Sequence, residues 1–228
     1  MRSVKAGVLV LGLLALGCAD GTTPMSETEG LDGAEMTEAG SESSATSGGT
    51  VYGVDADNYL VAFDLGRPGR VSRRVRITGT GGAKVVGIDF RPSAVSPATP
   101  DVIGKLYGIT KRRIYEIDPH TGAASNGQLL TVPLVGAFFG TGFNPTVDRL
   151  RNHGNTQQNV RLNVADGMTT QDTNLAYAAG DPGYGTAPSI AGTAYTNSDN
   201  DPATLTVLYA IDARRNVLTV LPSPNSGQ

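Results

Sequence analysis

The chain of 228 residues contains one cysteine, two histidines and no tryptophan. A single cysteine excludes an internal disulfide framework and any metal site built from several cysteines, so core packing must stabilise the fold. The histidines, His120 and His153, are the only ones available as bases for nucleophilic catalysis, and the sequence has no Gly-x-Ser-x-Gly motif to place a nucleophile beside them. We therefore predict no catalytic residue.

An excess of one charge is also missing from most of the chain. The sequence holds 18 basic and 21 acidic residues, and two of the basic and seven of the acidic ones lie within the first 49 positions. The remaining 16 basic and 14 acidic residues leave the rest of the chain almost neutral. Such a balance lacks the basic footprint of a nucleic-acid-binding protein. Glycine, by contrast, is abundant, with 30 residues that imply many turns.

The first 18 residues have the pattern of an export signal. Arg2 and Lys5 precede an apolar run at residues 6–16, which is too short to span a bilayer as a helix but suits a secretory signal. Residues 14–18 resemble the lipobox of bacterial lipoproteins, and this resemblance implies cleavage before Cys18 and lipidation of its side chain. An ordinary signal peptide with a cysteine at its cleavage site is the alternative.

Three segments follow from this leader. Ala19, rather than aspartate, comes after Cys18, and by the same resemblance this implies an outer-membrane or cell-surface location in the bacterial envelope. Residues 19–49 contain no aromatic residue, Lys or Arg, so they cannot bury enough apolar surface to offset their ordering entropy. We expect a signal peptide with its lipobox at 1–18, a disordered acidic tether at 19–49 and one folded domain at 50–228.

Short strand signals repeat through the expected domain. Residues 87–92, 105–110 and 113–118 are rich in β-branched and aromatic residues and end in turn residues. The start of this unit returns at 140–145 and 192–197, which are 53 and 52 residues further on. The full set of predicted strands is 50–55, 59–64, 71–78, 87–92, 105–110, 113–118, 128–134, 140–145, 148–152, 159–163, 174–178, 190–195, 206–212 and 216–221.

Four strands per unit at a period of about 53 residues are typical of a β-propeller blade. We therefore predict an all-β fold of antiparallel four-stranded repeats that is β-propeller-like. In this prediction the first repeat lacks its opening strand, and the last repeat lacks its fourth. A stacked sheet or sandwich is the alternative.

Five separated motifs resemble one known family. They lie, in the family's order, at residues 52–55, 63–69, 86–92, 143–149 and 174–182, and they resemble the domain of unknown function 4394 of secreted and anchored bacterial proteins. The resemblance covers residues 51–224 and implies no biochemical activity. The family has apolar residues where this chain has Asn152, His153 and Gly154, which predicts a weakened strand there. The family also continues past the position of Pro224, which predicts an incomplete propeller that is truncated or needs another chain.

Two features are candidates for ligand binding. Arg67, Arg70, Arg73, Arg74 and Arg76 place five guanidinium groups within ten residues, and arginine binds phosphate and carboxylate groups bidentately. A solvated outer strand that uses its charge to discourage edge pairing explains them as well.

Tyr184 is the second candidate, as an exposed ring for stacking on a sugar, with a packed loop anchor as the alternative.

We predict no cofactor and no metal site. Calcium is the alternative, because two groups of residues supply hard oxygen ligands. These groups are Asp55, Asp57 and Asn58, and Asp199, Asn200 and Asp201. Turn formation explains both groups equally well. Asp148 and Arg149 are adjacent and predict a structural ion pair.

These observations favour a non-catalytic binding or interaction domain of unknown ligand, anchored to the membrane through a lipid on Cys18. Its expected partner is an anionic envelope polymer, a glycan or a protein, and not a nucleic acid. One alternative is a calcium-dependent propeller hydrolase or lactonase-like enzyme, in which at least three acidic side chains would converge on the central axis. Another is a truncated family member without activity of its own.

Overall fold

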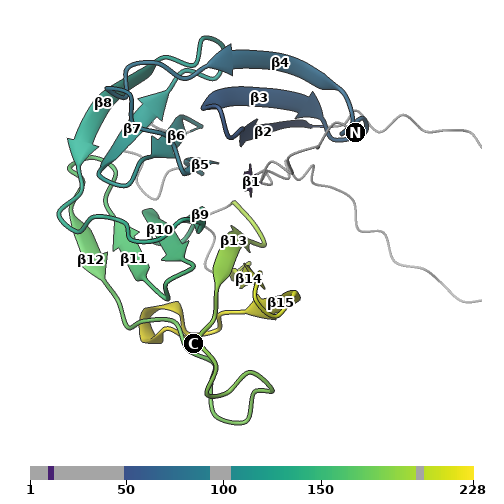
Figure 1. Ribbon diagram of the computed structural model, residues 1–228, viewed down its shortest axis with the longest axis vertical. Helices are drawn as coiled ribbons and strands as arrows, with labels where there is room; N and C mark the ends of the chain where they lie inside the picture. The colour runs from purple at the N-terminus through teal and green to yellow at the C-terminus, as the bar shows by residue number, and fades with distance from the viewer. Residues whose placement is uncertain (1–9, 13–48, 93–103, 199–202) are drawn as a thin grey trace, which may run out of the picture.

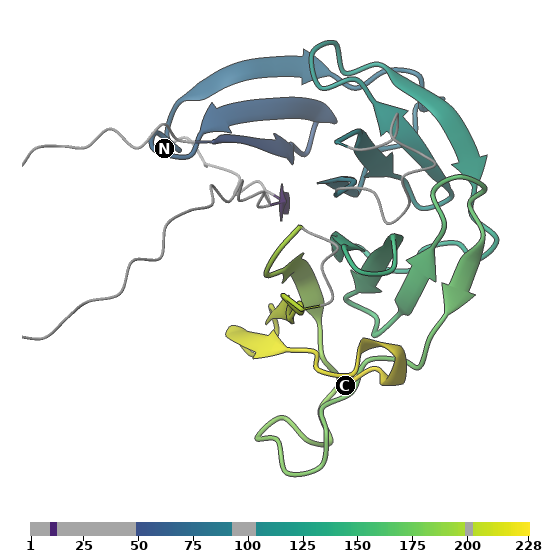
Figure 2. The same cartoon turned by 180° about the vertical axis from the view of Figure 1, so that it is seen from behind.

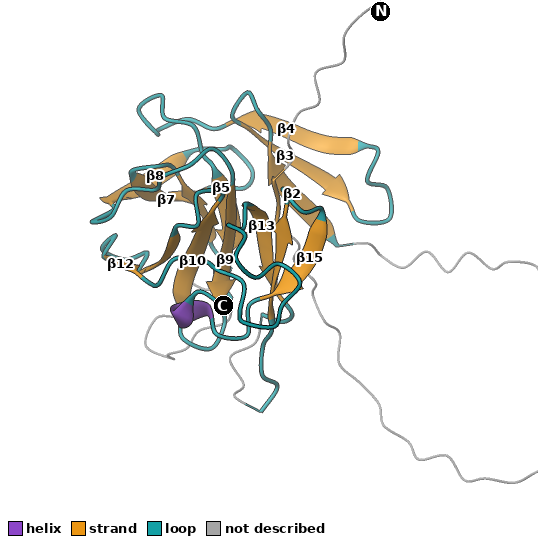
Figure 3. Cartoon of the chain, turned by 60° about the horizontal axis from the view of Figure 1, so that its bottom comes forward, coloured by secondary structure: helices purple, strands orange, loops and turns teal. Residues whose placement is uncertain are grey.

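The computed structural model describes residues 10–12, 49–92, 104–198 and 203–228, and they form four antiparallel sheets. The sheets surround a common centre like the blades of a propeller, and one side of the arc, between the fourth blade and the first, holds no described strand (Figures 1 and 2). Strands dominate, and the one helical segment drawn lies near the C-terminus (Figure 3). Among the described residues, no helix has the length and apolar character required to cross a membrane.

Each blade is a meander in which the first strand lies nearest the centre. Blade 1 consists of β1 (Val10–Gly12), β2 (Thr50–Val54), β3 (Tyr59–Asp64) and β4 (Val71–Arg76). Blade 2 consists of β5 (Gly87–Phe90), β6 (Leu106–Ile109), β7 (Arg113–Ile117) and β8 (Ala124–Leu129). Blade 3 consists of β9 (Phe139–Asn144), β10 (Arg149–Gly154), β11 (Asn159–Leu162) and β12 (Thr169–Gln171). Blade 4 consists of β13 (Ile190–Tyr195), β14 (Leu208–Asp212) and β15 (Val217–Val220), and the short 3-10 helix η2 (Pro224–Ser226) follows.

This architecture confirms the all-β, β-propeller-like prediction and its four-stranded repeat. The last repeat has three described strands, as expected, but the first repeat is complete. Val10–Gly12, within the predicted leader, pairs with Val54–Tyr52 and so takes the place of the opening strand that the sequence did not reveal. Cys18 and most of the predicted tether lie outside the described residues.

Two outer strands lie earlier in the chain than predicted. The fourth strand of blade 2 begins at Ala124 rather than at residue 128, because Gly122, with a φ of 73°, completes the preceding turn at once. The fourth strand of blade 3 is Thr169–Gln171, directly after the turn at Gly167, and residues 174–178 are not a strand. In both places a left-handed glycine makes the turn tighter than the sequence pattern implied.

The prediction of a weak strand at residues 152–154 is wrong. β10 extends through Gly154 and pairs with β9 along its whole length. The amide nitrogen of Asn152 donates a hydrogen bond of 2.7 Å to the Thr141 hydroxyl on β9, which ties its polar side chain to the neighbouring strand, while its Oδ1 has no partner among the described residues.

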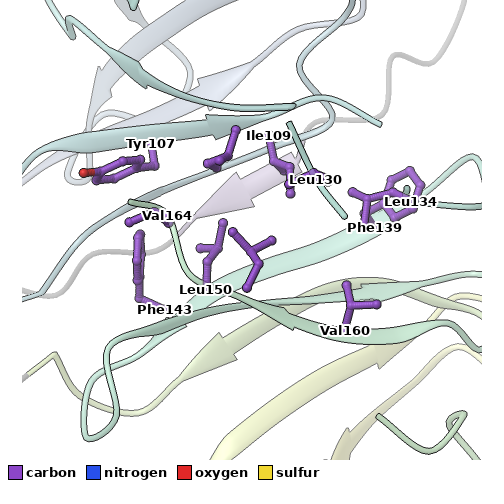
Figure 4. Close-up of a cluster of buried hydrophobic side chains, with 11 residues drawn as sticks. Tyr107, Ile109, Leu130, Leu134, Phe139, Phe143, Leu150, Val160 and Val164 are labelled. Carbon is purple, nitrogen blue, oxygen red and sulfur yellow. The ribbon is translucent and has the colours of Figure 1, made fainter. Parts of the chain in front are cut away.

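Apolar side chains fill the contacts between consecutive blades. Alternate residues of a strand face opposite sides, so Leu106 points to blade 1 while Tyr107 and Ile109 point to blade 3. The largest cluster joins blades 2 and 3, where Tyr107 and Ile109 lie opposite Phe143 and Leu150 (Figure 4). A separate cluster joins blades 1 and 2, and a third packs blade 4 against Leu175. Burial of each blade therefore depends on its neighbours.

The inner strands approach each other at the glycine that starts each repeat. A Cβ atom on Gly140 would lie 2.6 Å from the backbone nitrogen of Thr193 on the next blade. A Cβ on Gly87 would likewise overlap the side chain of Thr141. The repeated glycine thus has a physical cause, since it leaves room for the inner strand of the following blade.

Candidate functional site

A polar cavity of about 460 Å³ lies on the side of blade 3 that faces blade 4. We call it the arginine pocket. Its lining residues come from the four strands of blade 3, the adjacent turns and η2, and they are Asn144, Val147, Arg149, Arg151, Arg161, Asn163, Met168, Thr170 and Asn225.

The strand register explains why three arginines meet there. Arg149 and Arg151 are two apart on β10, so both side chains leave the same face of the sheet. Arg161 on β11 is the direct cross-strand neighbour of Arg151, and Thr170 on β12 is the neighbour of Arg161. Leu150, between the two β10 arginines, points the other way into the core shared with blade 2.

Arg151 forms the buried floor of the arginine pocket. Its side chain is 6% exposed, and it donates a 2.9 Å hydrogen bond to the carboxylate of Asp172, which is equally buried. It also donates to the side-chain oxygens of Asn159 and Asn225. Asp172 also forms an ion pair with Arg161, at 3.4 Å. One carboxylate therefore serves two guanidinium groups.

Arg149 has no acidic partner in the part of the chain that the structure describes. Its guanidinium donates a 2.9 Å hydrogen bond to the backbone carbonyl of Asp148. The predicted ion pair between Asp148 and Arg149 is wrong, because the Asp148 carboxylate is bound by both donors of Arg91 from blade 2. The arginine pocket thus combines three cationic side chains with one carboxylate, which suits an anionic ligand.

The structure divides the five predicted arginines instead of gathering them. Arg67 and Arg70 lie in the loop between β3 and β4, and Arg73 reaches blade 2, where it contacts the ring of His120 in an exposed turn. Arg74 lies 3.6 Å from the centre of the Tyr59 ring, and Arg76 lies 5.8 Å from it.

Arg74 is also occupied by Asp55, at 2.8 Å. Although burial raises the pKa of Asp55, hydrogen bonds from the Tyr59 backbone and from Arg74 outweigh it and hold that pKa below its usual value. Tyr184 is 66% exposed in the loop between β12 and β13, far from β4 in the arc (Figure 1). The five arginines and Tyr184 therefore do not form one site.

The first predicted calcium group uses its oxygens within the fold. Asp55 accepts hydrogen bonds from the backbone of Asp57 and Tyr59, and the amide oxygen of Asn58 accepts from Val85. The second group, residues 199–201, lies outside the described residues. No cluster of three or more His, Cys, Asp or Glu side chains suited to a metal occurs among the residues described.

The central axis carries one acidic side chain on the described inner strands, Asp89 on β5. Burial raises the pKa of Asp89 to about 7, against hydrogen bonds from the backbone nitrogens of Phe143 and Phe90. The convergence of three acids that would favour the calcium enzyme is therefore not seen in the described strands.

His153 is completely buried on β10, on the face toward blade 4. Neither ring nitrogen has a hydrogen-bond partner in the described chain. Burial, with a smaller effect from Arg151, lowers the pKa of His153 to about 3, so the ring is neutral at physiological pH. It lies within the packed interior instead of lining the arginine pocket.

A smaller cavity of about 260 Å³ lies beside β15, between the loop at residues 175–178 and the C-terminal segment. Its lining includes the apolar side chains of Leu175, Ile190 and Leu221. Its polar lining residues are Tyr177, Asp181, Thr219 and Gln228. The Tyr177 hydroxyl donates to the buried Asp212 at 2.7 Å, which fixes the loop on blade 4. No cationic side chain from the described part of the chain lines this cavity, in contrast to the arginine pocket.

The sequence reading missed the arginine pocket although its signal was present. The Arg-Leu-Arg pattern at residues 149–151 places two arginines on one face of a strand. The third arginine and Asp172 come from the following strand and loop, so their meeting depends on strand register.

The chain is similar to one family model and to solved structures. Residues 59–228 match the family model described as "Domain of unknown function (DUF4394)". A comparison with curated proteins gives no match. A structure titled "Crystal structure of BBS1N in complex with ARL6DN, soaked with lead" is similar, with a TM-score of 0.42 and 13% identity, covering 81% of this chain and 51% of that chain.

The same complex soaked with mercury gives a TM-score of 0.37 and 14% identity, covering 73% of this chain and 43% of that chain. The chain thus spans about half the length of the solved structures that it matches.

Proposed function

Since the chain belongs to the DUF4394 family, whose description assigns no activity, we propose its function from the site itself: a non-catalytic domain that binds anionic polymers in the arginine pocket. The observation that carries this proposal is the excess of three guanidinium groups over one carboxylate within a single cavity. The ligand class is a glycan or other envelope polymer that bears carboxylate or phosphate groups.

The arginines divide into a fixed pair and a free group. Arg151 and Arg161 are held by Asp172, so they form a preorganised floor whose geometry needs no rearrangement on binding. Arg149 is exposed at the mouth and supplies the fork that binds an anionic group bidentately. Asn144, Asn163 and Thr170 add neutral donors and acceptors that suit sugar hydroxyls.

Binding of polygalacturonate and of polyphosphate to the full chain tests the proposal, with uncharged dextran as the neutral probe. We expect the Arg149→Gln variant to bind the preferred anionic polymer about tenfold more weakly, because it loses a charged bidentate donor. Isothermal titration calorimetry at two salt concentrations measures this loss for each polymer. Polygalacturonate reports binding of carboxylate groups, and polyphosphate reports binding of phosphate groups.

Two variants serve as controls. Arg70→Gln makes the same change of charge at an exposed position of the β3–β4 loop and should leave affinity unchanged. Arg149→Lys keeps the charge without the planar fork and should recover only part of the affinity. Equal losses in the Arg70 and Arg149 variants, or equal binding of dextran, would contradict the proposal.

The same proposal includes anchoring in the bacterial envelope through a lipid on Cys18, as the leader predicts. The acidic segment at 19–49 would then space the arginine pocket from the membrane. Metabolic labelling with a radioactive fatty acid tests this part separately, because the wild-type chain should take up the label and the Cys18→Ala variant should not.

A further inference from the structure

The side of blade 4 that faces away from blade 3 is an apolar sheet face, and no described blade covers it, although β1 comes close to its inner strand β13. Its side chains come from alternate positions of the three strands, and they are Gly192, Ala194, Tyr209, Ile211, Leu218 and Val220. We call this set the open face of blade 4. We propose that a second copy of this chain covers the open face, so that two chains pair through it about a two-fold axis.

The repeats show that this kind of face is normally buried. Leu-Tyr-Gly-Ile at residues 106–109 of blade 2 corresponds to Leu-Tyr-Ala-Ile at 208–211 of blade 4. Figure 4 shows Tyr107 and Ile109 packed in the cluster between blades 2 and 3. They are 4% and 0% exposed, whereas Tyr209 and Ile211 are 37% and 53% exposed. The same positions of the repeat are therefore left uncovered in blade 4.

The glycine at the start of each repeat gives an independent indication that blade 4 is shaped to pack against another sheet. Gly87 and Gly140 are each required by the inner strand of the next blade, which would overlap a Cβ atom. Gly192 holds the same position in blade 4, yet a Cβ there would meet only the Ile211 side chain, at 3.8 Å. Blade 4 thus keeps the space above this glycine that an inner strand fills in blades 2 and 3, and no described strand fills it.

The arrangement of side chains on the open face fits a copy of itself. None of its strand positions carries a charge, so two copies can approach without repulsion. β13 contributes the small residues Gly192 and Ala194, while β15 contributes the bulky Leu218 and Val220. With a two-fold axis parallel to the strands and β14 over β14, the small edge of each copy receives the bulky edge of the other.

This pairing is independent of the arginine pocket, which is lined by blade 3 and η2. The pairing would build a two-layer sheet sandwich from two blades, with the sheets about 10 Å apart. Failure of one proposal therefore leaves the other standing, because binding of the anionic polymer and chain association are measured separately.

Sedimentation velocity of the full chain over a range of concentrations tests the pairing. We expect a monomer–dimer equilibrium that Ile211→Lys weakens at least tenfold, because it buries an unpaired charge in each copy. Val71→Lys is the matched control, since Val71 is 54% exposed on β4 and lies outside the open face. This control should leave the dimer unchanged, and circular dichroism should show that both variants are folded.

Gly192→Phe probes the fit directly. Within one chain the ring would enter open space, whereas in the pair it would occupy the place of Leu218 from the second copy. We expect a folded chain with weakened association. In a Cys18→Ser background, Ile211→Cys should be joined to its copy by a short bismaleimide, and Val71→Cys should not. A chain that stays monomeric throughout, or a dimer that survives Ile211→Lys and Gly192→Phe, would overturn the proposal.

Discussion

Replacement of Gly140 by alanine is expected to lower the free energy of unfolding by about 3 kcal/mol, while the same change at Gly192 is expected to raise it slightly. The two glycines occupy the same position in consecutive repeats. At Gly140 the new Cβ would lie 2.6 Å from the backbone nitrogen of Thr193 and 2.7 Å from the carbonyl carbon of Gly192. Backbone atoms cannot move aside as a flexible side chain does, so blades 3 and 4 would have to separate.

At Gly192 the new methyl group makes an ordinary contact with the Ile211 side chain, at 3.8 Å, and overlaps no described atom. Alanine also reduces the conformational freedom of the unfolded chain. Urea denaturation of the full chain, followed by circular dichroism, gives both values from one experiment. If both substitutions lowered the free energy of unfolding equally, atoms would have to lie as close to Gly192 as they do to Gly140, in contradiction to the geometry described here. Matching gains would mean that blades 3 and 4 do not pack closely.

Acidification from pH 6.5 toward pH 3 is expected to destabilise the chain through His153 by as much as about 5 kcal/mol. Burial lowers the pKa of His153 to about 3, compared with 6.5 for an ordinary histidine. Below pH 6.5 the unfolded chain binds a proton at this ring that the folded chain does not bind. The stability that His153 provides is therefore complete above pH 6.5 and is lost as the pH falls toward 3.

His153→Leu should remove this acid sensitivity. At pH 7 the variant should be as stable as the wild type or slightly more so, because two buried ring nitrogens without partners disappear. At pH 4 the free energy of unfolding of the variant should exceed that of the wild type by several kcal/mol, since only the wild type must release the proton of the residue 153 ring when it folds. Urea denaturation at intervals from pH 4 to pH 8 measures both curves.

Asp89 must be separated from this effect, because its shift has the opposite sign. The pKa of Asp89 is raised to about 7 in the folded chain, so acidification from pH 7 toward 3.8 stabilises the fold through this group. The difference between the two curves isolates His153, since both proteins keep Asp89. Parallel curves for the wild type and His153→Leu would contradict a buried neutral histidine.

The period of the strands could be read from the sequence because each repeat begins with the same backbone requirement. The glycines at 87, 140 and 192 mark close approach of inner strands, and the first two are explained by contacts with the following blade. The turns that end at Gly122 and Gly167 could be read from the sequence, but the start of the strand after each could not, because a left-handed glycine lets the strand begin at once and leaves no periodic signal. Both outer strands were consequently predicted too far along the chain.

The arginine pocket depends on information that spacing along the chain does not contain. Five arginines close together in sequence, at 67–76, are divided between a loop and the two faces of β4. Arg149 and Arg151 share a face through their spacing, but Arg161 joins them only because β10 pairs with β11 in one register. A shift of that register by one residue would turn Arg161 to the other face and bring Leu162 into the cavity.

The first blade has a consequence for the maturation of the protein. β1 lies within the predicted leader, and the cleavage before Cys18 that we propose would remove it from β2, its partner in the first sheet. The precursor would then hold a complete first blade, and the mature chain would expose the inner edge of β2 with unpaired backbone amides. Processing by the signal peptidase would thus act as a structural step, and amide hydrogen exchange along Thr50–Val54 would be slower before cleavage than after it.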